Sequence, residues 1–150
     1  QYKFQSGDFP GAILDYQQII NRYPRSEWRD LAEYRIALVH LRSVPRPNLD
    51  QSELRKAREA LTSYIAAHPE GAFLEEARAA LGECLEELAE GELIIGNFYR
   101  TIGKKWAAAQ RYKAVLTGFG GTRAAEQAQL LLPLVEGAPL PESSPALGGS

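Results

Sequence analysis

The sequence predicts an all-α fold, a solenoid of stacked helical hairpins with one long extended helix. The first observation is a spacing that recurs near the two ends of the chain, with identical gaps between its members: Gly7, Ala12, Tyr16 and Ile19, then Gly103, Ala108, Tyr112 and Val115. Gaps of four and three residues place the small and the larger apolar residues on one helical face. The second observation is the lack of strand signals, because the sequence has neither sustained apolar–polar alternation nor an Asn-Gly or Asp-Gly turn.

A third copy of the spacing lies between the other two and reads Ala57, Leu61, Tyr64 and Pro69. In each copy the small residue allows a neighbouring helix to approach closely, and the larger residues fill the groove beside it. Helical hairpins of this kind bury their apolar faces only when they stack on one another. The three copies therefore predict three hairpins stacked in sequential order.

The first hairpin is bounded by glycine, proline and capping residues. A helix is expected to end at Gly7, and Asp8 can then cap a helix that Pro24 stops. Ser26 can cap the second helix, which we expect to continue to about Arg42.

The second hairpin follows residues 43–48, whose two prolines exclude regular helix. Asp50 and Glu53 have the spacing of a capping box at the start of its first helix. Pro69 and Gly71 then end that helix.

One helix in the middle of the chain is predicted to be unusually long. The helical pattern continues from Ala72 for about thirty residues and ends at Gly103. Gly82 and Gly96 lie fourteen residues apart, close to four helical turns, so both face the same way. We expect one continuous helix, with Gly91 as its candidate kink, rather than two short helices.

The last hairpin is expected to be a helix over residues 105–117, a glycine-rich turn over 118–121 and a helix over 122–135. The final residues, 136–150, are rich in Pro, Gly and Ser, a composition typical of disordered tails. The sequence therefore predicts one helical repeat domain over residues 1–135 and a disordered tail over residues 136–150.

Composition and charge argue against several classes of function. The formal net charge of -2 gives no electrostatic reason to expect a nucleic acid or an anionic membrane surface as partner. No apolar run approaches the ~20 residues that span a bilayer. The single cysteine, Cys84, excludes an internal disulfide framework, and its place in a helical pattern predicts a buried packing residue.

The sequence offers no arrangement typical of a catalytic, metal or cofactor site. His40 and His68 are isolated, without a second histidine or a cysteine at ligand spacing. His68 precedes Pro69 at a helix end, where a cation is favourable. The glycines within residues 118–121 lack the Lys-Ser/Thr that completes a phosphate-binding loop. We therefore expect a protein that is not an enzyme and binds neither a metal nor a cofactor.

The repeated residues resemble tetratricopeptide repeats, in which pairs of helices stack side by side. Longer stretches resemble the BamD-like family of outer-membrane protein assembly lipoproteins, namely Leu88-Ala89-Glu90, Glu92-Leu93, Asn97-Phe98-Tyr99, Ala107-Ala108 and Arg111-Tyr112. The proline-rich insert and the long helix belong to the same resemblance, which covers about residues 1–135. The chain departs from the repeat pattern at Lys105, where an aromatic residue is expected and Trp106 follows instead.

The resemblance implies a scaffold on the periplasmic face of the bacterial outer membrane, tethered through an N-terminal lipid anchor that this sequence lacks. It implies protein partners, namely periplasmic domains of the barrel-forming subunit and incoming outer-membrane protein precursors, and no nucleic acid. The membrane would be reached only through that anchor. Two other roles stay open for the same fold: a periplasmic adaptor in cell-envelope division or cell-wall synthesis, and regulation of an enzyme domain elsewhere in the chain.

Five residues are candidates for partner binding. Asn97 and Arg100 share a helical face at i, i+3 and can bind a peptide backbone or a terminal carboxylate, although a solvated polar stripe has the same pattern. Tyr34 and Arg35 form a second, similar pair. Trp28, just inside a helix, either anchors a partner or covers the junction between adjacent hairpins.

Overall fold

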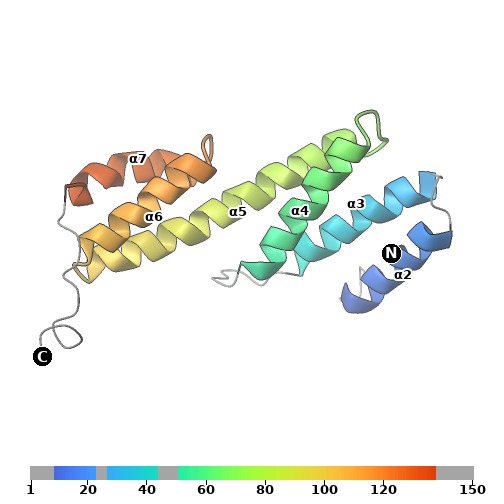
Figure 1. Cartoon of the computed structure of the whole chain (residues 1–150), viewed down its shortest axis with the longest axis horizontal. Helices are drawn as coiled ribbons and strands as arrows, with labels where there is room; N and C mark the ends of the chain where they lie inside the picture. The colour runs from blue at the N-terminus through green and yellow to red at the C-terminus, as the bar shows by residue number, and fades with distance from the viewer. Residues whose placement is uncertain (1–8, 23–26, 44–50, 138–150) are drawn as a thin grey trace, which may run out of the picture. The chain divides into compact units, whose positions relative to one another are not determined.

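The described part of the chain consists of helices joined by short turns. The structure is a computed structural model, and it describes residues 9–22, 27–43 and 51–137 (Figure 1). Within those ranges there is no strand, and the helices are α2 (Phe9–Arg22), α3 (Glu27–Arg42), α4 (Ser52–Ala67), α5 (Leu74–Thr101), α6 (Lys105–Gly118) and α7 (Arg123–Val135). The predicted all-α fold of helical hairpins is confirmed.

The chain divides into two compact units, residues 1–88 and residues 89–150. The long helix α5 contributes residues to both units. It has 28 residues and continues without a break past Gly82, Gly91 and Gly96. One long helix was therefore the correct expectation, although it begins at Leu74 rather than at Ala72.

In the first unit, α2 and α3 pack against each other around two alanines. Ala12 of α2 and Ala32 of α3 are buried together with Tyr16 and Val39. Because alanine has a short side chain, the two helices can approach closely at this point. Larger apolar side chains surround the contact and are partly buried against it: Phe9, Ile13, Ile19, Ile20 and Ile36.

The first unit continues with α4, which packs on α3, and with the first half of α5. Two hydrogen bonds join α5 to the start of α4. Cys84 Sγ donates to the Leu54 carbonyl at 3.1 Å, and Gln51 Nε2 donates to the Leu88 carbonyl at 2.9 Å. Burial raises the pKa of the Cys84 thiol to about 11, so the thiol stays protonated and remains a donor. The prediction that Cys84 is a buried packing residue is confirmed.

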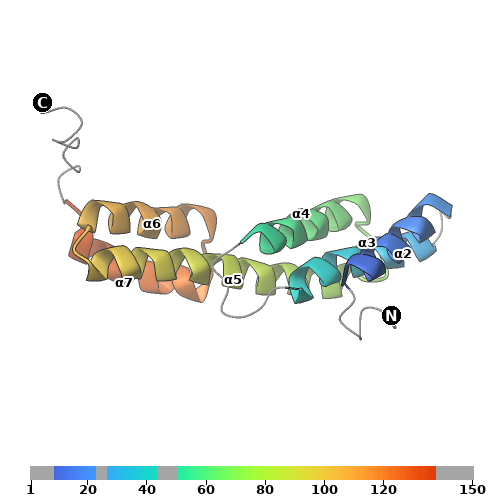
Figure 2. The same cartoon turned by 90° about the horizontal axis from the view of Figure 1, so that it is seen from below.

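The second unit is built from the end of α5 with α6 and α7, and α6 lies beside α5 in both views (Figures 1 and 2). Its core is a cluster of mostly small side chains around Tyr112 and Val115. Gly103 has a φ of 83°, the left-handed conformation that favours glycine, and it makes the turn between α5 and α6. Thr122 caps α7, because its hydroxyl accepts a hydrogen bond from the Ala125 N–H at 3.1 Å.

The predicted capping box of α4 depends on Asp50, which lies outside the described residues. Gln51 occupies the N-cap position, and its side chain makes no capping hydrogen bond because the amide is turned toward Leu88. Several other predicted features lie outside the described residues: Gly7, Asp8, Pro24, Ser26 and the tail from residue 138.

Candidate functional site

Asn97 and Arg100, the first predicted pair, meet at the hydroxyl of Tyr112. Tyr112 Oη on α6 donates to Asn97 Oδ1 at 2.6 Å and accepts from Arg100 Nε at 3.0 Å. The i, i+3 spacing places both side chains on one face of α5, as predicted. Gly96 makes the contact possible, because a Cβ there would lie 2.8 Å from Cε1 of the Tyr112 ring. Tyr112, which the sequence suggested only as a packing residue, therefore positions the candidate pair.

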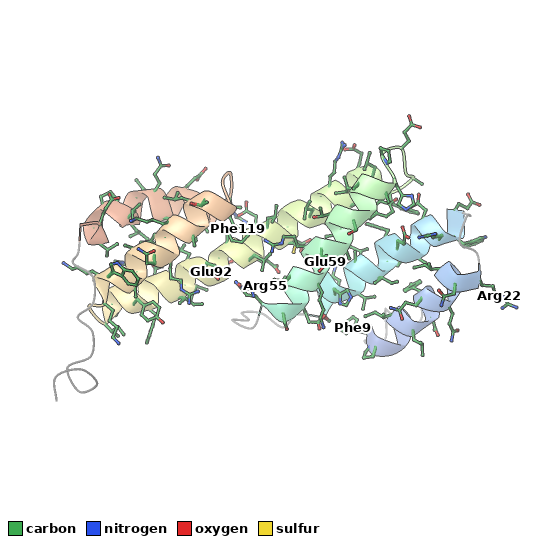
Figure 3. All side chains as sticks on the ribbon, in the orientation of Figure 1. Phe9, Arg22, Arg55, Glu59, Glu92 and Phe119 are labelled. Atoms are coloured by element: carbon green, nitrogen blue, oxygen red, sulfur yellow. The ribbon has the colours of Figure 1, made fainter. Side chains whose placement is uncertain are left out.

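An ion pair also joins α6 to α5 within the second unit. Arg111 Nη1 lies 2.7 Å from Glu92 Oε2, and Figure 3 labels Glu92 on α5. Only 13% of the Glu92 side chain is exposed, so the pair is partly shielded from water. Together with the Tyr112 contacts, it holds this part of α5 in a fixed position relative to α6.

A row of exposed apolar side chains follows the same part of α5. Ile94 and Phe98 of α5 and Ile102, one residue past its end, are spaced by four residues. The Ile102 N–H still donates to the Phe98 carbonyl, so the three side chains follow one side of the helix, and Phe98 is 58% exposed. Two exposed lysines, Lys104 and Lys105, come directly after the row. We call Ile94, Phe98 and Ile102 the apolar row. Sequence reasoning missed it, although its i, i+4, i+8 spacing was a readable signal.

The second predicted pair, Tyr34 and Arg35, belongs to the first unit and is mostly covered. The Tyr34 ring stacks on Phe73, with ring centroids 5.1 Å apart, and is only 9% exposed. Burial raises the pKa of the Tyr34 hydroxyl, and the nearby Glu76 carboxylate raises it further. Arg35 Nε is buried and has no hydrogen-bond acceptor within the part of the chain that the structure describes. Tyr34 is therefore a packing residue in this state, with Arg35 beside it.

Trp28 stands apart from that pair on the exposed side of α3. It is the second residue of the helix and is 54% exposed. Trp28 therefore offers a large apolar surface on the first unit, as an anchoring residue would. The structure thus brings Asn97 and Arg100 together, and it keeps Trp28 and Arg35 in the other unit.

His68, predicted to lack a histidine or cysteine partner at ligand spacing, has two carboxylate neighbours on α3 instead. Its Nε2 lies 2.5 Å from Glu33 Oε2, and its Nδ1 lies 3.8 Å from Asp30 Oδ2. Tyr64 Oη donates to Asp30 and accepts from the Phe73 N–H at 3.2 Å. No local pattern predicts this cluster, because 35 residues separate His68 from Glu33.

His40, the other histidine, also has a carboxylate partner. Its Nδ1 lies 2.8 Å from Glu53 Oε2 on α4. The hydrogen bond from His40 is the main reason that the pKa of Glu53 is lowered. Burial alone would raise the pKa of Glu33, but hydrogen bonds from Arg29 and His68 outweigh it, and the pKa is lowered.

The described residues show exposed apolar and basic side chains and no cluster suited to a metal ion. Across residues 9–22, 27–43 and 51–137, no three His, Cys, Asp or Glu side chains are placed to hold a metal ion. Over the same ranges, no helix combines the length and the apolar character that crossing a bilayer requires. The exposed features are instead the apolar row, the neighbouring lysines and Trp28.

Two comparisons with known proteins found matches for this chain. The model of a family named YfiO and described as an outer membrane lipoprotein matches residues 2–135. The chain is also similar to the outer membrane protein assembly factor BamD of Caulobacter vibrioides, with 28% identity over 113 residues. Those residues are 75% of this chain and 37% of the relative, so the chain spans well under half of the relative's length.

Proposed function

Because the chain belongs to the YfiO family of outer membrane lipoproteins, we propose that it is a non-catalytic helical-repeat scaffold of outer-membrane β-barrel assembly. The observation that carries this proposal is the family match over residues 2–135, which includes every described helix. The name of the Caulobacter relative, an outer membrane protein assembly factor, supports the same role. Stacked helical hairpins suit it, since they present extended surfaces to other proteins.

The proposed partners are periplasmic domains of the barrel-forming subunit and incoming outer-membrane protein precursors. The apolar row supports protein binding, because exposed apolar side chains bordered by polar residues are typical of protein interfaces. Phe98 can supply the buried centre of such a contact, and Lys104 and Lys105 can meet acidic groups at its rim.

The proposed contact residues are Asn97 and Arg100 beside the apolar row, and Trp28 in the first unit. Tyr34 and Arg35 are proposed to support that part of α3 rather than to touch a partner themselves. Asn97 and Arg100 are half-buried and held by Tyr112, so a partner would find them in one fixed geometry. Trp28 is already exposed, whereas Tyr34 supports α3 from inside.

We also propose that the full protein is held at the periplasmic face of the outer membrane by an N-terminal lipid. The support is the family description as an outer membrane lipoprotein. The described part of the chain would then reach its partners from the aqueous side of that membrane.

Affinity purification of the tagged protein from a solubilised envelope extract tests the proposed function. We expect it to recover barrel-assembly subunits. Phe98→Ser should reduce that recovery about tenfold, because loss of a central interface contact costs about 1.4 kcal/mol or more. Leu14→Ser is the matched control, since Leu14 is 56% exposed against 58% for Phe98 and lies on α2.

Two results would count against these proposals separately. Recovery of unrelated proteins only would contradict the role in barrel assembly. Recovery of barrel-assembly subunits that Phe98→Ser leaves unchanged would contradict the apolar row as the contact surface.

A further inference from the structure

The second unit contains a long stretch without an acidic residue. From residue 93 to residue 125 the sequence has six lysines and arginines and neither aspartate nor glutamate, although the whole chain has a formal net charge of -2. Arg111 is paired with Glu92. Lys104 and Lys105, in contrast, form no ion pair within the part of the chain that the structure describes. Their charges are therefore available to a molecule outside this chain.

The position of these two lysines does not favour the helix that they begin. Lys104 is the N-cap of α6 and Lys105 is its first residue, and the first turn contains no acidic residue. Because the N-terminus of a helix carries a partial positive charge, cations are unfavourable there. A local arrangement that costs stability without a gain for the fold indicates a role in function.

The apolar row lies on the side of α5 that faces away from α6. Glu92 and Gly96 contact α6. Ile94 and Phe98 each lie two residues further along α5, which is about 200° around the helix axis. The described helices leave this side of α5 uncovered, since Phe98, Ile102 and Ile94 are 58%, 48% and 38% exposed.

The row and the lysines are held as one surface by contacts within the second unit. The Phe98 ring contacts the ring of Tyr99, with centroids 5.7 Å apart, and Tyr99 packs on the core of the unit. Two backbone hydrogen bonds close the end of α5. The Ile102 N–H donates to the Phe98 carbonyl at 3.1 Å, and the Lys104 N–H donates to the Tyr99 carbonyl at 2.8 Å. A partner would therefore find the apolar and basic side chains in a fixed order.

We propose that the apolar row, together with Lys104 and Lys105, binds an acidic amphipathic helix of a partner protein. Leucine-like side chains of that helix pack along the row, and its glutamate or aspartate side chains pair with the two lysines. The apolar row is also the contact surface in the proposed function, so the assignment rests on that proposal and adds the chemistry of the partner.

A helix fits the shape and the length of the row. Side chains spaced by four residues form a ridge on α5, and the ridges of one helix pack into the grooves of another. From Ile94 to Ile102 the row rises about 12 Å along the helix axis. Two to three turns of a partner helix, roughly 11–16 Å, are therefore enough to cover it.

An anionic membrane surface is the competing occupant, because apolar and basic side chains also occur together in segments that bind lipid. Segments of that kind contain clusters of about four to eight lysines and arginines. Here the row is followed by two lysines, and the net charge of the chain is negative. The observations therefore favour a protein partner.

The test uses the whole chain and two synthetic helical peptides labelled with a fluorophore. Each peptide has about 18 residues, because shorter peptides are marginal as helices. The first has leucine at helical spacing and glutamate on its polar face, and the second has lysine in place of every glutamate. Fluorescence anisotropy measures both dissociation constants. We expect the glutamate peptide to bind about tenfold more tightly than the lysine peptide.

Three variants of the protein locate the binding surface. Lys104→Glu with Lys105→Glu should reverse the preference, so that the lysine peptide binds more tightly. Phe98→Ser should weaken binding of the glutamate peptide about tenfold, because the central apolar contact is lost. Arg55→Glu with Lys56→Glu is the matched control, since it makes the same change of charge at two adjacent exposed cations on α4. It should leave the preference as in the parent.

Equal affinity of the parent for the two peptides would overturn the acidic helix as the occupant. Binding to phosphatidylglycerol vesicles that Lys104→Glu with Lys105→Glu abolishes would then identify a membrane surface instead. Equal effects of the two double charge reversals would also overturn the proposal, because binding would then follow net charge rather than this surface.

The acidic helix and the role in barrel assembly can fail separately. Recovery of barrel-assembly subunits that depends on Phe98, without a preference between the peptides, would overturn only the acidic helix. Recovery of unrelated proteins, with a clear preference for the glutamate peptide, would contradict only the role in barrel assembly.

Discussion

The side chain of Tyr112 both packs in the core of the second unit and positions the candidate binding pair, Asn97 and Arg100. Its ring lies against the backbone of α5 at Gly96, and its hydroxyl lies between Asn97 and Arg100. The Tyr112 ring can pack there only because Gly96 has no side chain, and the positions of Asn97 and Arg100 depend in turn on the Tyr112 hydroxyl. A change at Gly96 should disturb packing first and the arrangement of the polar pair as a consequence.

We expect Gly96→Ala to lower the free energy of unfolding by about 1–3 kcal/mol, the usual cost of overpacking. The added Cβ would lie 2.8 Å from Tyr112 Cε1, and the ring is buried and cannot move freely. Gly82→Ala on the same helix is the matched control, because a Cβ there meets nothing within 4 Å. It should raise stability by up to about 1 kcal/mol. Urea unfolding followed by circular dichroism measures the free energy of unfolding of both variants. Equal changes in Gly96→Ala and Gly82→Ala would argue against the close contact between Gly96 and Tyr112.

What the sequence could predict at this scale is limited to contacts along one helix. The spacing of three residues predicts that Asn97 and Arg100 share a helical face, and in the structure both side chains bond to the same Tyr112 hydroxyl. Their contact with Tyr112 depends on how α6 folds back on α5, which no local pattern specifies. The partners of His68 are farther still, on a helix more than thirty residues away. Long-range polar contacts are therefore the part that sequence reasoning missed.

At the scale of elements, α5 is the helix that contributes residues to the cores of both units. It supplies Cys84 and Leu88 to the first unit and Leu93 and Gly96 to the second. Its N-terminal turns carry Glu75 and Glu76, and its last turn carries Arg100, which suits the helix dipole. Continuity of α5 between the units is therefore expected to matter for stability.

Glu90→Pro should break that continuity. Glu90 is an exposed residue in the interior of α5, where proline removes a backbone hydrogen bond and clashes with the preceding turn. We expect the free energy of unfolding to fall by about 3 kcal/mol, and the helical circular dichroism signal to fall with it. Glu90→Ala should stay within about 0.5 kcal/mol of the parent. If the proline variant behaved like the alanine variant, α5 would not be a continuous helix in solution.

Element lengths were easier to predict than element ends. Proline and glycine residues set the limits of α5 and α6 to within two or three residues, because these residues act locally on the backbone. The start of α4 was also predicted closely, since α4 begins at Ser52 with Gln51 in the N-cap position. Gln51 is turned toward the Leu88 carbonyl of α5, and this contact rather than a capping box uses its side chain.

At the scale of the whole molecule, the two units carry different features. The first unit has the histidine–carboxylate contacts of His40 and His68 and the exposed Trp28, and the second has the apolar row with Asn97 and Arg100 beside it. The family match covers both units. The fold and the family could be read from the repeats and the long helix. The spacing of the apolar row was also readable, but only the folded chain shows that its side chains are exposed.

Site-specific photo-crosslinking in living cells tests most directly the central claim that this protein binds the components of barrel assembly. A photoreactive amino acid in place of Phe98 should form adducts that contain barrel-assembly subunits or barrel precursors, identified by mass spectrometry. The same probe in place of Glu75, whose side chain is 80% exposed on the first-unit part of α5, is the control and should form few such adducts. Adducts at Phe98 that contain none of these proteins, or the same adducts at both positions, would contradict the claim.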